Sequence, residues 1–416
     1  MSKSKSARKP ARKTAESSDN LARGEAISQM EPMVLSADSK HRTALTDLTV
    51  ELVSRSAGFG RSLPEGVLSA LAKLVRAMNC YYSNLIEGHE THPIDIERAL
   101  KEDYSAESKK RNLQLEAKAH IAVQRWIDEG GLSGRAASVA GIRATHRRFC
   151  EGLPQELLWV EDPETNERIK VIPGKFRQRD VKVGHHVPVS PGALPHFLER
   201  FESVYRNLGK TDSIVAAAAA HHRLLWIHPF ADGNGRVARL MSHAMLLESL
   251  DTDGVWSIAR GLARNVSMYK SLLMACDGQR RNDLNGRGNL SEEALAEFTH
   301  FFLKTCIDQV DFMERLVQPA RLRDRIVIWA QEEIRADTIQ PRSDKLLEAV
   351  LYRGELHRGE IAQMLGVSDR QARRVTSTLL EREVLISGSS RAPLRLAFPA
   401  ALASRWMPGL FPEQTE

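Results

Sequence analysis

Helical periodicity is the feature of this 416-residue sequence that most limits its fold. In residues 65–87, apolar side chains recur at spacings of three and four, which places them on one face of a helix. Similar patterns predict further helices at 35–58, 93–100, 106–129, 138–151, 194–208, 211–227, 233–250, 265–276, 291–316 and 319–335. Only 6% of the residues are aromatic, and Leu and Ala lead the apolar set, which also favours helices. We therefore expect a mainly α protein.

Residues 152–192 interrupt the helical pattern, because Pro, Gly and β-branched residues cluster there. Two short runs, 169–172 and 180–183, flank a turn-forming sequence at 173–177. They predict a β-hairpin over about 171–186 inside the helical domain.

A composition break at 336–342 predicts a separate C-terminal domain. Helical patterns at 343–353, 357–365 and 368–383 precede two short strand patterns at 384–387 and 394–397. This order resembles a winged helix-turn-helix domain.

The net charge of +6 is a property of the N-terminus. Six cations precede the first acid, Glu16, and account for the whole net charge: Lys3, Lys5, Arg8, Lys9, Arg12 and Lys13. A basic segment without large apolar residues is expected to be disordered. It suits contact with nucleic acid or anionic lipid, or service as a solubilising tail.

The four cysteines are scattered, at positions 80, 150, 276 and 306. Their spacing favours a reducing cytoplasm and excludes a zinc site built from cysteine. No apolar run approaches the roughly 18 residues that cross a bilayer, and no secretory signal is evident, so we expect a cytoplasmic protein without membrane contact.

Residues 228–239, His-Pro-Phe-Ala-Asp-Gly-Asn-Gly-Arg-Val-Ala-Arg, carry the chemistry. Pro229 must end the preceding helix, and the glycine-rich turn then opens a new one, where free N–H groups and the helix dipole favour an anion. Arg236 and Arg239 share a helical face and suit a polyphosphate. Asp232 is an oxygen ligand suited to Mg²⁺, and His228 suits a general base. His221 or His222, on the preceding helix, is placed to orient that base.

These residues match the Fic family signature, His-x-Phe-x-Asp/Glu-Gly-Asn-Gly-Arg-x-x-Arg, at every specified position. The resemblance implies a Fic-type helical core that transfers AMP from Mg-ATP to Tyr, Thr or Ser hydroxyls of target proteins. It implies a base at His228, a buried Phe230 under the loop and a Mg²⁺ ligand at Asp232. It implies phosphate contacts from Gly233, Asn234, Gly235, Arg236 and Arg239.

The same resemblance assigns roles to two neighbouring segments. The predicted hairpin occupies the position of the family's flap, which pairs with the target segment, and its expected ledge is Val181, Lys182, Val183 and Gly184. Tyr269 falls where relatives carry tyrosines beside the nucleotide.

A second family pattern, Ser/Thr-x-x-x-Glu-Gly/Asn, fits Ser83, Glu87 and Gly88. It implies that Glu87 pairs with Arg239 and removes the cation that the γ-phosphate needs. Ser83, one helical turn earlier, is expected to steady the carboxylate. The same Glu87 can instead position water for the reverse reaction, AMP removal.

The C-terminal helical pattern 368–383 begins with Arg370, Gln371, Arg373 and Arg374, side chains suited to a DNA groove or to phosphates. Homodimer contact or recruitment of a protein target is an equal alternative for this domain.

Two function hypotheses follow: an autoinhibited protein adenylyltransferase, or a DNA-binding regulator whose Fic domain senses nucleotide. The expected divisions of the chain are 1–34 basic tail, 35–110 inhibitory helical region, 111–280 catalytic core, 281–335 helical connection, 336–402 winged helix-turn-helix and 403–416 C-terminal tail.

Overall fold

A computed structural model describes residues 22–161, 166–250, 254–286 and 288–412. Helices dominate these residues and strands are few and short, so the prediction of a mainly α fold is confirmed. The main body contains α1 (Arg42–Gly60), α2 (Glu65–Ile86), α3 (Pro93–Leu100), α4 (Ser108–Trp126), α5 (Val139–Glu151), α6 (Leu194–Tyr205), α7 (Lys210–Ile227), α8 (Asn234–Leu250), α9 (Ile258–Arg264), α10 (Val266–Cys276), α11 (Glu292–Val317) and α12 (Pro319–Arg335).

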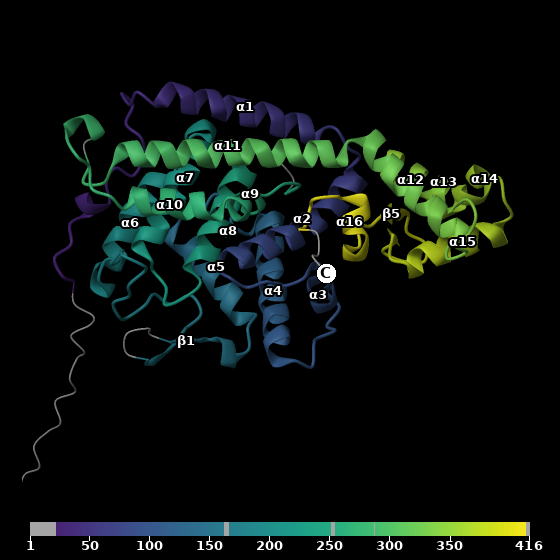
Figure 1. Ribbon diagram of the computed structural model, residues 1–416, viewed down its shortest axis with the longest axis horizontal. Coiled ribbons are helices and arrows are strands. Elements are labelled where there is room, and N and C mark those ends of the chain that lie inside the picture. Colours follow the sequence, from purple (N-terminus) through teal and green to yellow (C-terminus); the bar gives the residue numbers. More distant parts are fainter. Residues whose placement is uncertain (1–21, 162–165, 251–253, 287, 413–416) are drawn as a thin grey trace, which may run out of the picture.

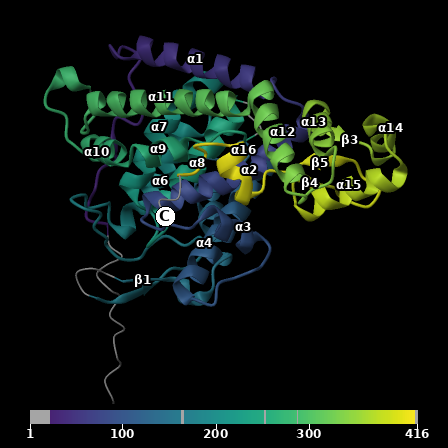
Figure 2. The ribbon, with the colours of Figure 1, turned by 45° about the vertical axis from the view of Figure 1, so that its right-hand side comes forward.

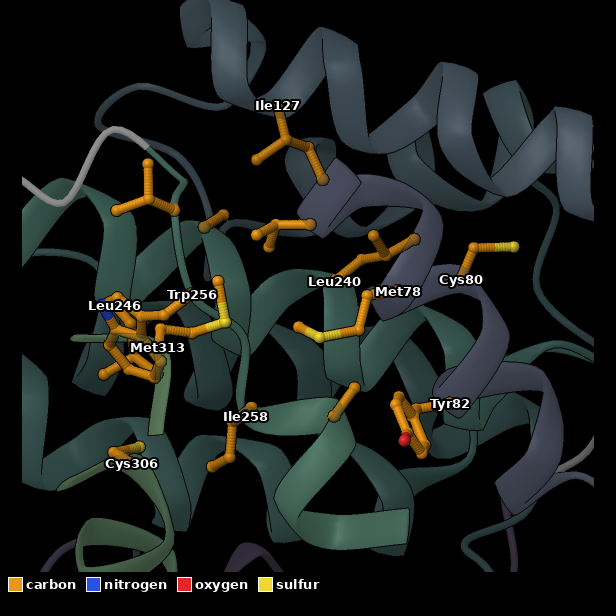
Figure 3. Close-up of a cluster of buried hydrophobic side chains, with 14 of the residues drawn as sticks. Met78, Cys80, Tyr82, Ile127, Leu240, Leu246, Trp256, Ile258, Cys306 and Met313 are labelled. Carbon is orange, nitrogen blue, oxygen red and sulfur yellow. The ribbon is translucent and has the colours of Figure 1, made fainter. Parts of the chain in front are cut away.

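The body is built around the pair α7 and α8. Buried alanines at 216–220 give α7 a small-residue surface on which neighbouring helices pack closely. Helices α1 and α11 lie side by side along one edge of the body, at the top of Figure 1. Figure 3 shows part of the core between α2, α8, α9 and α11, where Met78, Leu240, Ile258 and Met313 are buried.

Three segments expected at the periphery belong to the core. Residues 1–21 of the predicted tail lie outside the described residues, but Met30 and Met33 are fully covered, and Arg200 binds Glu31. The expected connection at 281–335 contains α11, whose phenylalanines 298 and 302 lie against His221.

The predicted C-terminal tail is the third such segment. It contains α16 (Ala403–Trp406), and Trp406 packs edge-on against Trp329 with ring centroids 5.2 Å apart. The Tyr82 hydroxyl donates to the carbonyl of Leu410, 3.0 Å away, so the end of the described chain is fixed to α2.

The predicted hairpin at 171–186 is wrong in position. The two strands are β1 (Trp159–Glu161) and β2 (Arg168–Lys170), which pair antiparallel with Val160 opposite Ile169. Residues 171–187 follow as a loop whose only bridge among the described residues joins Val183 to His186. A side chain holds this loop instead of a strand partner, because Arg177 donates to the carbonyls of Arg179, Val189 and His228.

The C-terminal part contains α13 (Ser343–Arg353), α14 (Ile361–Leu365) and α15 (Asp369–Glu381), with β3 (Glu355–Leu356), β4 (Leu385–Ile386) and β5 (Leu394–Leu396). The predicted strands are β4 and β5, and β5 lies between β3 and β4 in an antiparallel sheet. Figure 2 shows this part at one end of the molecule, next to α12. The sequence patterns missed β3, α9 and α16, which are two to seven residues long.

The C-terminal sheet meets the start of α2 through two glycines. A Cβ on Gly66 would lie 2.3 Å from the carbonyl oxygen of Gly354, so no larger residue fits without moving the backbone. A second contact joins the C-terminal part to α3, where the Ala400 N–H donates to Glu97. None of the helices in the described ranges is long and apolar enough to cross a membrane.

We predict that Gly66→Ala destabilises the chain by about 1–3 kcal/mol, because the added methyl group overlaps backbone that cannot rotate away. The matched control is Gly60→Ala at the end of α1, where an added Cβ meets nothing within 4 Å. Urea unfolding measures both. Equal unfolding midpoints for the two variants would contradict the prediction.

Candidate functional site

The loop between α7 and α8 begins with a left-handed residue. His228 has φ 50° and ψ 63°, and its N–H still donates to Leu224 in the last turn of α7. The following Pro229 disfavours a helical conformation at this position, which explains why the helix ends here. Arg177 fixes the loop from the other side by donating from Nε to the His228 carbonyl, at 2.8 Å.

Phe230 and Asn234 hold the shape of the turn. Phe230 is fully buried and stacks on His146, with ring centroids 3.8 Å apart and planes 3° from parallel. The Asn234 side chain bonds both the N–H and the carbonyl of Phe230, at 3.0 and 2.9 Å. The side chain of Asn234 is therefore used by the turn, and its backbone amide remains for a ligand at the start of α8.

Asp232 lies exposed in the same turn, and one of its carboxylate oxygens accepts from the Gly233 N–H at 2.6 Å. Within the described ranges, no group of three or more His, Cys, Asp or Glu residues could hold a metal ion. A single carboxylate fits Mg²⁺, which is usually held by one or two carboxylates together with phosphates and water. The residues therefore fit a metal that arrives with the nucleotide.

Arg239 is bound to α2. Its side chain is 4% exposed, and its Nη2 lies 2.5 Å from Glu87 Oε1. Its Nε donates to the Ser83 hydroxyl at 2.8 Å, so Ser83 steadies the arginine and not, as expected, the carboxylate. Burial opposes ionisation of Glu87, but Arg239 outweighs it and the pKa of Glu87 is lowered. The ion pair is thus charged at neutral pH.

Glu87 also reaches the glycine turn. A Cβ on Gly235 would lie 2.3 Å from Glu87 Oε1, so a larger residue there would displace the Glu87 carboxylate from its present position. Gly88 follows with φ +83°, a conformation that also favours glycine. Ser83 and Glu87 of the predicted inhibitory pattern therefore both contact Arg239, and Glu87 also reaches the glycine turn.

Arg236 has partners that the sequence did not reveal. Its Nη2 lies 2.8 Å from Glu116 on α4 and 3.1 Å from His89 Nδ1. The Glu116 carboxylate accepts a hydrogen bond from His89, and this raises the pKa of His89. Arg236 Nε is buried with no partner among the described residues, which suits an added anionic ligand. Glu116 is 120 residues from Arg236 in the sequence, so only tertiary packing brings the two side chains together.

His228 is suited to accept a proton. Burial and the nearby Arg177 lower its pKa to about 4, so its ring is neutral at physiological pH. Its Nδ1 is buried and lacks a partner in the described part of the chain. The expected orienting role of His221 or His222 is not seen, because His221 bonds Ser242 and Tyr269 while His222 bonds Asp277.

Tyr269 does not line an open nucleotide surface. It is 2% exposed, and its hydroxyl lies 2.6 Å from His221 Nε2. Burial raises the pKa of Tyr269, and the nearby Arg239 opposes this rise. The tyrosine therefore packs beneath Arg239 and does not offer a ring face for adenine.

A groove of about 570 Å³ opens beside His228, and we call it the flap groove. Its wall is formed by β1, β2 and the loop 171–187, and His228 and Ala231 lie along it. Val181, Lys182 and Val183 line it as predicted ledge residues, and Gly184 makes the turn with φ +60°. The ledge is a loop, but it lies next to the proposed base.

The C-terminal candidates form a separate surface. Arg370, Arg373 and Arg374 are exposed on α15, whose opposite face is buried through Ala372, Val375 and Leu379. Gln371 differs, because its side-chain oxygen accepts from the Ser368 N–H in a capping box and only its amide NH₂ remains for another partner.

Comparisons with known proteins agree with this geometry. The Fic/DOC family model matches residues 137–246, which contain the whole His228–Arg239 motif. A protein adenylyltransferase Fic from Drosophila mojavensis is 42% identical over 79 residues, 18% of this chain and 16% of that protein. The Drosophila sechellia protein of the same name is 28% identical over 189 residues, 44% and 35% of the two chains.

The similarity to solved structures concerns the fold. A Fic family protein from Desulfovibrio desulfuricans G20 superposes with a TM-score of 0.52 at 17% identity, over 88% of this chain and 98% of that chain. The chain spans little more than a third of the length of the curated relatives at most. Residues 137–246 thus form a Fic/DOC family domain, and the chain is a Fic domain protein.

Proposed function

We propose that this chain is an autoinhibited protein adenylyltransferase that transfers AMP from Mg-ATP to Tyr, Thr or Ser hydroxyls of target proteins. The observation that carries the proposal is the juxtaposition of a neutral, half-buried His228 with a glycine turn and two arginines, one of them held by Glu87. All four cysteines are buried free thiols, which supports a place in the reducing cytoplasm.

The proposed reaction assigns one task to each group. His228 takes the proton of the incoming hydroxyl, and the hydroxyl oxygen attacks the α-phosphorus while the bond to pyrophosphate breaks. Backbone amides of 233–235 at the start of α8 hold phosphate oxygens, and Arg236 and Arg239 neutralise the charge of the leaving group. Mg²⁺, held through Asp232, supplies further charge neutralisation when bound.

Autoinhibition follows from the competition for Arg239. A guanidinium bound to a carboxylate at 2.5 Å cannot also bind the γ-phosphate through the same N–H groups. ATP therefore binds in an unproductive orientation while Glu87 stays in place. Glu87 keeps 35% of its side chain exposed, so we also propose that it can activate water for AMP removal.

Replacing the inhibitory residue tests the proposal. We expect Glu87→Gly to raise self-modification with labelled ATP about tenfold or more, since one charged hydrogen bond to Arg239 is lost. His228→Ala in the same background should abolish the signal. Glu90→Gly, an exposed acid three residues away, is the matched control.

An unchanged rate in Glu87→Gly at several Mg²⁺ concentrations would refute the brake, and activity without His228 would refute the base. A chase of the labelled chain with unlabelled ATP measures AMP removal, which should be lost in Glu87→Gly.

The pH profile tests the state of His228. For a histidine of ordinary pKa, the fraction in the neutral form would fall about fourfold between roughly pH 8 and pH 6. Because burial and Arg177 lower the pKa of His228 to about 4, we expect the initial rate of Glu87→Gly to stay flat over this range. The rate should fall only as the pH approaches 4. A fourfold decline centred near 6.5 would contradict the assignment.

The exposed arginines of α15 favour one additional function, DNA binding by the C-terminal part. Affinity for a duplex should fall steeply with salt, and the double variant Arg373→Ala/Arg374→Ala should reduce the logarithmic slope by about two. Arg111→Ala on α4 is the control for net charge. If the chain does not bind the duplex at low salt, a homodimer or a protein-docking role is favoured instead. Analytical ultracentrifugation of the chain alone distinguishes these two roles.

A further inference from the structure

The flap groove carries a biased charge. Three exposed lysines, Lys170, Lys175 and Lys182, line it, whereas its acids are Glu161 and Asp180. Asp180 lies 3.6 Å from Arg23, so a neighbouring cation already offsets one of these two acids. The groove is therefore basic, and acidic groups near it gain favourable electrostatic energy.

The same groove exposes apolar side chains. Ile172, Val183 and Val187 are 43%, 43% and 54% exposed, and all three line it. Large exposed apolar residues are few in the described ranges, and a cluster of them in a concave surface marks a binding site. An apolar side chain of a partner can cover these three.

Backbone groups are also accessible. No hydrogen bond within the described residues engages the N–H or carbonyl of Val181, and Val181 is partly exposed on the groove wall. An extended segment can bond such groups by strand-like pairing, which holds a backbone regardless of its sequence. Side-chain preference must then come from the lysines and the apolar cluster.

We propose that the flap groove selects extended target segments that carry acidic side chains and an apolar side chain next to the modified hydroxyl. That the hydroxyl is modified rests on the proposed transferase function. Which segment binds depends only on the groove. The main competing occupant is the chain's own basic N-terminus, which leads to Arg23 beside Asp180 and Pro188. Its lysines and arginines would repel the groove, so we assign the groove to an acidic partner.

Fluorescent peptides of equal length test the selection by direct binding to the full chain. The first contains a central Ser flanked by Glu residues and one Leu, the second replaces Glu by Lys, and the third is residues 1–21 of this chain. We expect the acidic peptide to bind about tenfold more tightly than the lysine peptide, as two or three exposed ion pairs allow. The preference should shrink at high salt.

Charge reversal identifies the groove. Lys175→Glu/Lys182→Glu should invert the preference, whereas Lys304→Glu, an exposed lysine of α11, should leave it unchanged. Ile172→Ser/Val187→Ser should weaken the acidic peptide and its lysine counterpart alike, because both contain the Leu. Equal affinities, no binding by any peptide, tighter binding of the 1–21 peptide or an unaltered preference after charge reversal would each overturn the proposal.

A parallel assay separates this inference from the proposed function. If the acidic peptide binds but Glu87→Gly transfers no label to it or to the chain itself, the groove proposal stands and the transferase proposal fails. If Glu87→Gly labels itself but prefers neither peptide, the transferase proposal stands and the groove proposal fails.

Discussion

The buried guanidinium of Arg239 is the constraint on which the site depends. A cation that is 4% exposed needs compensating groups, and removing a partner from such a pair costs about 3–5 kcal/mol. Here Ser83 and Glu87 supply the compensation. In the proposed function a nucleotide phosphate would supply it instead, so the carboxylate and the phosphate would compete for the same N–H donors. Gly235 allows Glu87 its present position, because a side chain there would push the Glu87 carboxylate aside.

Helix α2 connects this ion pair to the far end of the molecule. Its first turn meets Gly354 through Gly66, and near its end Tyr82 binds Leu410 while Ser83 and Glu87 contact Arg239. The C-terminal part and the Glu87–Arg239 ion pair therefore contact one and the same helix of 22 residues. Through this helix, the proposed binding at α15 and the proposed control of Arg239 would be structurally connected.

Local signals account for what the sequence predicted well. Helices with strong apolar spacing, such as α2 and α12, were placed within one residue, and the Glu87–Arg239 contact followed from a motif whose residues are defined by chemistry. The loop 171–187 was misassigned because its β-branched residues face a groove and are not paired in a sheet. Glu116 escaped notice because its partner lies 120 residues away on another helix. Tyr269 was assigned to the nucleotide by position, whereas packing against His221 buries it.

The two motif arginines differ in a way that makes one of them a gate and the other a fixed support. Glu87 is the C-cap residue of α2 and 35% exposed, so a small movement of one helix end withdraws it. Glu116 lies within α4 and is 14% exposed, and it holds only Nη2 of Arg236. The remaining N–H groups of Arg236 can bind phosphate without breaking that contact, since a guanidinium has five. Under the proposed mechanism, productive binding of the γ-phosphate therefore requires Glu87, but not Glu116, to leave its arginine, while the contact of His89 with Glu116 holds the segment after Gly88.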